Sequence, residues 1–439
     1  MPPPRILLCT VGTGNLDQLE ATLLVPLSKS IRDGEWSRVI LLPSQITADN
    51  AAILRDRIAD VAIEISPLPG PGLENNADAC FAHFDSELSK LRAVGISADD
   101  ILVDFTRGTK AMSAALVLAA VAHGLPRVRY ILSEQRDGRG MVVPGTEVVG
   151  NFDTRAASAR QRLDEALHLF SRGDFAAVLD LFALVDGVQT SDRWPSALQP
   201  QVAAIRALAQ FHAAWDRLDY RAARTCVVPA PAVLSGSWSR FLPHDVTRQW
   251  VAALGEPLPT EPRKRAHQLR CLAVDLLANG ERRLRDQHFE DALLRAYRVL
   301  ELIGQFRLLD HGLLSEDLPH DDSRIRDFQS DAFNRGWLLR GDRRGRLTAT
   351  RESAARLLLH LKDPMAHTLL AIADEGAVST TARNVSVLIH GFEAQAGSDA
   401  APLESIYRKL EMTLIQDSPG EAARRLCIAR VLDFTRTAS

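Results

Sequence analysis

The chain has 439 residues, more than a single hydrophobic core ordinarily organises, so we expect two or three domains. Hydrophobic residues make up 46% and charged residues 24% of the sequence, which is the balance of a folded globular protein rather than a disordered one. The formal net charge of −3 excludes a global positive field, so any surface that binds nucleic acid must be local.

The cysteines and the apolar runs indicate the cellular setting. The five cysteines are scattered without a CxxC pair, which argues against structural zinc and a disulfide framework and favours the reducing cytoplasm. The opening segment MPPPRILLCTVGTG has one basic residue and a short apolar run, so we expect a first strand there and no signal peptide. The longest apolar run, AALVLAAVAHGL, is too short to cross a bilayer, and we expect no membrane segment.

Residues 5–150 alternate between strand and helix patterns. Short runs rich in Val, Ile and Leu, without strict alternation, are typical of strands buried on both faces of a parallel sheet; they cover 5–11, 38–43, 61–68, 100–106 and 127–133. Helical stretches lie between them at 16–33, 48–60, 79–95 and 110–124. This order predicts an α/β, Rossmann-like, doubly wound parallel sheet in a domain spanning 1–152, closed by an edge hairpin at 140–150.

Helical periodicity dominates from about residue 155 to the end. Three segments place a polar turn and an aromatic residue, Phe175, Tyr220 or Phe289, ahead of an Ala-containing helix, as in αα-hairpins. Their uneven spacing excludes a fixed-period solenoid. Pro-rich stretches at 226–245 and 254–265 interrupt the helices and are interpreted as loops. We therefore expect an all-α linker domain over 153–280 and a second all-α domain over 281–439.

The last domain contains a locally basic stretch, residues 336–362, with many arginines and few acids. Two interpretations are open for it. It is either a solvated helix face with a GDRRGR turn, or a surface that contacts RNA.

Two glycine-containing turns mark a candidate ligand site. The first predicted strand ends in TVGTGN (10–15) and the fourth in TRGTK (106–110), each just before a helix. Ligands of open parallel sheets bind beyond the carboxyl ends of the strands, and helix N-termini favour anions. The Thr hydroxyls, Arg107 and Lys110 add donors suited to phosphate and sugar oxygens. Neither turn matches GxGxxG or GxxxxGKS, and the alternative is that Gly12, Gly14 and Gly108 only make tight turns.

The same segments resemble a known family. VDFTRGTKAMSAALVLAAVAHG resembles the ligand-binding motif of the CRISPR-associated Rossmann-like (CARF) domain, and TVGTGNLDQLEATL resembles its first ligand loop. The resemblance implies a homodimer that binds a cyclic oligoadenylate across its twofold axis. The matched positions are Thr10, Gly12, Thr13, Gly14, Thr106, Arg107, Gly108, Thr109 and Lys110. Arg107 stands where glycine is more usual, which leaves open the ring size and any ring-opening activity.

A second candidate site lies on a predicted helix in STTARNVSVLIHGFEA, residues 379–394, with Thr380 or Thr381 as its N-cap. Arg383 and His390 are seven residues apart and therefore project from nearly the same helix face. A metal-free ribonuclease needs such a pair: a histidine to move the proton of the 2′-hydroxyl or the leaving oxygen, and a fixed cation to stabilise the phosphorane.

The spacing alone is weak evidence, because Arg162–His168, Arg206–His212 and Arg283–His288 fall in the same window. However, RNVSVLIHGF resembles the R-N-x-x-x-x-x-H signature of HEPN ribonucleases, which are all-helical domains with an active site at a dimer interface. The resemblance implies catalytic roles for Arg383, Asn384 and His390. Residues 289–313 also resemble a HEPN helix, but we interpret its Arg295, Tyr297, Arg298 and Glu301 as the outer face of an amphipathic core helix.

Together these features predict a cytoplasmic, homodimeric, metal-independent endoribonuclease that cleaves single-stranded RNA when a cyclic oligoadenylate binds, with no further cofactor. Two alternatives stay open: a non-catalytic sensor or adaptor, and a ring nuclease that degrades the cyclic ligand. No winged-helix pattern and no D…E-x-K arrangement is evident, which disfavours a DNA-binding module and a metal-dependent nuclease.

Overall fold

The computed structural model describes residues 5–133, 135, 143, 146–186, 194–234, 236–341, 346–375 and 400–432. The chain forms two compact units, one made of Met1–Ala166 and Leu181–Val202 and the other of Leu167–Asp180 and Ala203–Ser439. Among the described residues, no helix is both long enough and apolar enough to span a bilayer.

The first unit is built on one six-stranded sheet with the order β3-β2-β1-β4-β5-β6. The strands are β1 (Ile6–Val11), β2 (Arg38–Pro43), β3 (Ile63–Ile65), β4 (Ile101–Asp104), β5 (Arg127–Ser133) and β6 (Glu147–Asp153). All pairs are parallel except β5–β6, which is antiparallel and forms the edge. The predicted doubly wound sheet is therefore confirmed. The strand order reverses between β1 and β4, where such sheets bind ligands.

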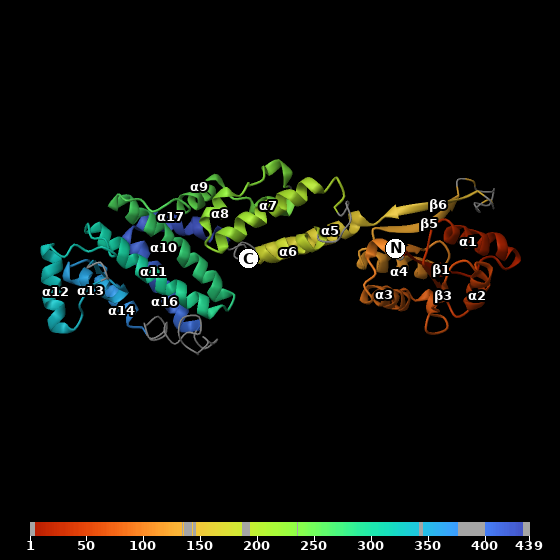
Figure 1. Ribbon diagram of the computed structural model, residues 1–439, viewed down its shortest axis with the longest axis horizontal. Helices are drawn as coiled ribbons and strands as arrows, with labels where there is room; N and C mark the ends of the chain where they lie inside the picture. The colour runs from red at the N-terminus through yellow and green to blue at the C-terminus, as the bar shows by residue number, and fades with distance from the viewer. Residues whose placement is uncertain are drawn as a thin grey trace. The chain divides into compact units, whose positions relative to one another are not determined.

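Helices lie on the two faces of this sheet (Figure 1), and a hydrophobic core fills the space on each face. Alternate residues of β1 point to opposite faces, so Leu8 packs with the helices α3 (Ala77–Ala93) and α4 (Lys110–Ala122). Leu7 and Cys9 pack with α1 (Val25–Arg32) and α2 (Ala48–Arg57). Burial on both faces explains why the strand sequences show continuous apolar runs.

The remaining elements are mostly helices: α5 (Arg155–Ser171), α6 (Phe175–Asp186), α7 (Gln199–Asp216), α8 (Tyr220–Thr225), α9 (Asp245–Leu254), α10 (Pro262–Arg285), α11 (Phe289–Asp310), α12 (Ser323–Arg335), α13 (Arg351–His360), α14 (Ala366–Ala373), α16 (Ala400–Asp417) and α17 (Pro419–Ala429). In the second unit α10, α11 and α16 pack against one another (Figure 1). A two-stranded ribbon, β7 (Arg340–Gly341) with β8 (Leu347–Thr348), interrupts the helices, which the all-α prediction did not include.

The three predicted αα-hairpins have the same type of turn between their helices. Phe175, Tyr220 and Phe289 are each the first residue of a helix, and each follows by two positions a residue with positive φ. Those residues are Gly173, Leu218 and Gln287, at 85°, 63° and 62°. A left-handed residue just after a helix reverses the chain direction. The aromatic residue that follows is then buried or half-buried in the packed pair.

The predicted domain boundary at 280/281 falls inside α10, and the three-domain division stays a prediction. Gly280 does not break α10. A Cβ there would lie 1.9 Å from the hydroxyl oxygen of Tyr407, so the glycine lets α16 pack closely on α10. The Tyr407 hydroxyl donates to the carbonyl oxygen of Ala292 on α11, at 2.7 Å.

A buried ion-pair cluster joins the helices of the second unit. Arg307 on α11 binds Asp363 in the α13–α14 turn at 2.7 Å and Asp417 at the end of α16 at 3.1 Å. Arg270 on α10 also binds Asp417, at 2.6 Å. The side chains of Asp363 and Asp417 are 0% and 2% exposed, so these carboxylates depend on their partners for solvation.

Asp363 should make the stability of the chain pH-dependent. Burial raises the pKa of Asp363, but hydrogen bonds from Arg307, the Met365 amide and His311 outweigh burial and lower it below the ordinary value. Its contribution is therefore present above the unfolded pKa of about 4 and is lost as the pH falls through the lower folded pKa. We expect Asp363→Asn to lower the free energy of unfolding by about 3 kcal/mol at pH 7, because it removes one of the two buried carboxylates that Arg307 binds.

Chemical denaturation at pH 7 and at pH 3 measures this effect. The gap between Asp363→Asn and the natural chain should narrow at pH 3, whereas the exposed Asp374→Asn should differ little from the natural chain at either pH. An Asp363→Asn cost that is equal at both pH values would contradict the assignment.

Candidate functional site

The two glycine turns meet at the carboxyl ends of β1 and β4. Cys9 of β1 lies opposite Asp104 of β4, so the segments that follow them run side by side. A Cβ on Gly12 would lie 3.2 Å from the backbone nitrogen of Gly108, and a Cβ on Gly108 would lie 3.1 Å from the Cβ of Thr10. A side chain at either position would therefore crowd the other turn. The structure therefore brings together the two turns that the sequence singled out.

A pocket of about 270 Å³ opens between these turns. Seven of the nine predicted ligand-binding residues line it, namely Gly12, Thr13, Gly14, Thr106, Arg107, Gly108 and Thr109. Thr10 is fully buried beneath the Gly108 turn, and Lys110 is exposed at the start of α4. Neither of these two lines the pocket, and their part in binding stays a prediction.

A buried carboxylate holds the second turn in place. Asp104 accepts hydrogen bonds from the Thr106 amide, at 2.8 Å, and from the hydroxyls of Thr106 and Ser30. The Thr106 hydroxyl oxygen also accepts from the Ile131 amide at 2.8 Å, which ties the turn to β5. Burial raises the pKa of Asp104, and these hydrogen bonds oppose the rise. Asp104 therefore fixes the conformation of the second turn and does not itself line the pocket.

Side chains at the start of α2 hold the first turn in place by hydrogen bonds to its backbone. The Thr47 hydroxyl donates to the carbonyl oxygen of Val11 at 2.8 Å, and the Asn50 amide donates to the carbonyl oxygen of Gly12 at 3.1 Å. At the second turn Thr109 caps α4 by accepting from the Met112 amide at 3.2 Å. The amino end of α4 therefore faces the pocket with its positive dipole end, which favours an anion.

Two charged side chains complete the lining. Arg107 is half-buried, and burial lowers its pKa against the opposing influence of Glu147 and Asp104. An arginine nevertheless stays charged at neutral pH. Within the described part of the chain its Nε atom, which is buried, has no hydrogen-bond partner. The same holds for Oε2 of Glu74, which also lines the pocket. The pocket thus combines an unused donor with an unused acceptor.

Sequence reasoning missed Glu74, Ser44 and Thr47, which also line the pocket. Ser44 and Thr47 follow β2, a neighbour of β1 in the sheet, and Glu74 follows β3, the next strand beyond β2. The predicted parallel strand order could have indicated them, because the loops that follow parallel strands all lie at the same end of the sheet.

The second candidate site, Arg383, Asn384 and His390, lies outside the described residues, and its roles stay a prediction. Helices α14 and α16, which precede and follow that segment in sequence, pack on each other and on α11.

One member of each of two other arginine–histidine pairs, His212 and Arg283, has a structural role. His212 is fully buried, donates from Nε2 to the Phe241 carbonyl oxygen at 3.0 Å, and packs edge-on against Phe170. Burial lowers the pKa of His212 to about 4, so it is a neutral core residue. Arg283 forms an ion pair with Asp216.

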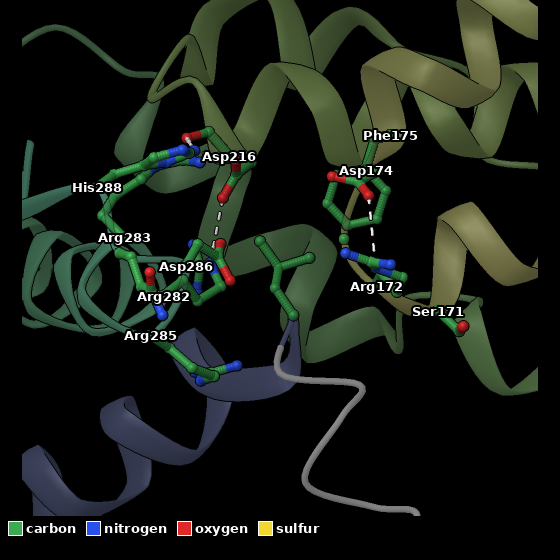
Figure 2. Close-up of a pocket in the computed structure, with 13 residues that line it drawn as sticks. Ser171, Arg172, Asp174, Phe175, Asp216, Arg282, Arg283, Arg285, Asp286 and His288 are labelled. Carbon is green, nitrogen blue, oxygen red and sulfur yellow. Dashed lines mark hydrogen bonds and ion pairs between the residues drawn. The ribbon is translucent and has the colours of Figure 1, made fainter.

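Arg283 and His288 line a second pocket, of about 440 Å³, between the α5–α6 and α10–α11 turns (Figure 2). Arg282 binds Asp216 at 3.1 Å, and Arg172 lies 3.8 Å from Asp174. The three aspartates of the lining offset three of its four arginines, so the pocket presents little concentrated positive charge.

The outer face of α11 has the structural role expected from its sequence. Arg295 binds Asp291 at 2.9 Å, and Arg298 binds Glu301 at 2.8 Å. Tyr297 lies beneath the guanidinium of Arg351, 4.4 Å from it.

In the basic stretch, the guanidinium of Arg356 stacks 3.5 Å from the Trp337 ring and also binds Glu352 at 2.7 Å. Residues 342–345 of that stretch lie outside the described residues. A role for this surface in contacting RNA stays a prediction.

Comparisons with known proteins show what this chain is similar to. Residues 262–414 match the family described as the Csm6 HEPN domain. The structure resembles Enterococcus italicus Csm6 bound to cyclic hexa-2′-fluoro-hexa-dAMP with a TM-score of 0.58 and 13% identity, covering 98% of this chain and 99% of that one. Can2 from Sulfobacillus thermosulfidooxidans, in complex with cyclic tetra-adenylate, is matched with a TM-score of 0.23 and 12% identity over 49% of this chain and 67% of that one.

No curated protein matches the sequence. The Csm6 HEPN match and the Csm6 fold confirm the resemblance of this chain to the CARF–HEPN ancillary proteins of type III CRISPR systems.

Proposed function

We propose that the chain binds a cyclic oligoadenylate in the pocket between the β1 and β4 turns and then cleaves single-stranded RNA in its HEPN domain. The pocket itself carries the proposal. It combines the amino end of a helix, glycines that allow close approach, and Arg107, whose Nε has no hydrogen-bond partner among the described residues; together these features suit a phosphodiester. The protein of similar fold from Enterococcus italicus is bound to a cyclic oligoadenylate analogue.

The cleavage step is proposed to need no metal. His390 would move the proton of the attacking 2′-hydroxyl or of the leaving 5′-oxygen, and Arg383 would stabilise the charge on the phosphorane. Asn384 would position these groups. The products would be a 2′,3′-cyclic phosphate and a 5′-hydroxyl.

Regulation is proposed to act through a homodimer in which two HEPN motifs form one active site. A ring that binds the sensor dimer more tightly in its active arrangement would shift the population toward paired motifs. An assay of ring-dependent RNA cleavage tests this proposed function as a whole.

The sensor half is tested first by binding. The side chain in Gly12→Val would crowd the Gly108 backbone and fill the pocket, so we expect affinity for the ring to fall by roughly 10- to 100-fold. Isothermal titration with cyclic tetra- and hexa-adenylate measures the loss. Gly341→Val is the matched control, because Gly341 is exposed and a Cβ there meets nothing within 4 Å. Wild-type affinity in Gly12→Val would place the ring elsewhere.

A further inference from the structure

Glu74 is the feature of the pocket that phosphate binding does not explain. Its Oε2 is shielded from solvent and lacks a hydrogen-bond partner among the described residues. A carboxylate repels a phosphate and only accepts hydrogen bonds. Leaving a buried acceptor unpaired is costly, and Glu74 is one of the residues that line the pocket, so a ligand that brings a donor to this side chain would remove the cost.

The backbone of Glu74 is fixed independently of its side chain. Glu74 lies in the short turn Leu73–Asn75 just before α3, and its carbonyl oxygen accepts from the hydroxyl of Thr109, the residue that caps α4. The Asn76 amide closes the turn by donating to the Leu73 carbonyl at 2.9 Å. These bonds couple the position of Glu74 to the second glycine turn, and they survive a change of the Glu74 side chain.

We propose that Glu74 selects adenine by accepting a hydrogen bond from the exocyclic amine of one base, while Arg107 binds a phosphate of the same ring. This inference rests on the proposed function. The donors of a cyclic oligoadenylate are its exocyclic amines and its 2′-hydroxyls. The base is the group that projects from the ring and enters a pocket of about 270 Å³, whereas each ribose is tied to a phosphate on both sides. Hypoxanthine carries a carbonyl oxygen at the position of the amine, which Glu74 would repel, and its own donor, the N1–H group, lies at a different place on the ring.

The experiment measures binding to the full chain of three rings of one size: cyclic oligoadenylate, the matching cyclic oligoinosinate, and 2′-fluoro cyclic oligoadenylate. We expect the natural chain to prefer the adenylate ring over the inosinate ring by roughly 10- to 100-fold, the cost of an unpaired buried acceptor. In Glu74→Gln the preference should shrink to about threefold or less, because an amide both donates and accepts. Asp78→Asn, an exposed carboxylate at the start of α3, should keep the full preference.

The outcomes distinguish a failure of the proposed function from a failure of the role assigned to Glu74. If the natural chain binds no ring, the proposed function fails. If it binds rings but Glu74→Gln discriminates as the natural chain does, only the role of Glu74 is overturned. If the effect of Glu74→Gln disappears on the 2′-fluoro ring, Glu74 contacts ribose and the assignment to the base is wrong. Should Glu74→Gln fold poorly by thermal melting, Glu74→Asp replaces it, with a loss of adenylate affinity as the expected result and unchanged affinity as the contrary one.

Discussion

His390→Ala is expected to abolish RNA cleavage while leaving the affinity for the cyclic oligoadenylate unchanged. Removing a general acid or base costs roughly 10²- to 10⁴-fold in rate, and here the same group would also serve the partner motif across the proposed dimer. The residues that line the sensor pocket lie between Val11 and Met112, so a change at position 390 removes none of them, and the affinity should stay the same. A single-turnover assay on a fluorogenic RNA measures the rate, and titration measures the affinity.

His367→Ala is the matched control, because His367 is an exposed histidine on α14 of the same domain. It should cleave at the rate of the natural chain. Arg383→Ala should lose activity as His390→Ala does, with ligand binding retained. Cleavage by His390→Ala at the natural rate would remove the motif from the mechanism.

Asp275→Ala is expected to lower the free energy of unfolding by about 3–5 kcal/mol, because it removes the acceptor of three buried donors. Asp275 on α10 is 1% exposed and accepts from Trp215 at 3.1 Å, Trp250 at 3.0 Å and Tyr220 at 2.8 Å. Burial raises its pKa, and these hydrogen bonds oppose the rise. The bonds join α7, α8, α9 and α10.

Thermal melting followed by tryptophan fluorescence measures this loss directly, since two of the donors are indoles. At about 2–4 °C per kcal/mol for a unit of this size, the midpoint should fall by roughly 10 °C. Asp245→Ala serves as the control, because its side chain is 80% exposed and pairs with Arg248 on the same helix. A midpoint within 2 °C of the natural chain would mean that water replaces the carboxylate.

The sheet and the glycine turns were predictable because both follow local rules. Strands buried on two faces need continuous apolar runs, and the switch point fixes where their loops meet. The segment 16–33 was predicted as one helix, but α1 begins only at Val25, after a 3₁₀ turn and a π turn. Pro26 lacks an amide hydrogen and so cannot extend a regular helix from the preceding turn.

Long-range contacts were not predictable from one sequence. Glu74 is part of no motif, and only the fold shows that its loop lies at the carboxyl ends of β1 and β4. Asp275 looks like a solvated charge on a helix, because nothing local reveals that Trp215, Tyr220 and Trp250 converge on it. The αα-hairpins were visible through their aromatic residues, whereas the left-handed Leu218 and Gln287 in the turns were not.

The central claim is that ring binding at the pocket switches on RNA cleavage, and one measurement tests it most directly. Cleavage of a fluorogenic single-stranded RNA is followed in the presence of a chelator, with cyclic tetra-adenylate, cyclic hexa-adenylate or no ring. We predict that one ring size accelerates cleavage strongly in the natural chain and that neither does so in His390→Ala. Tight binding of a ring without any cleavage would contradict the account and leave the chain as a sensor that acts through another partner.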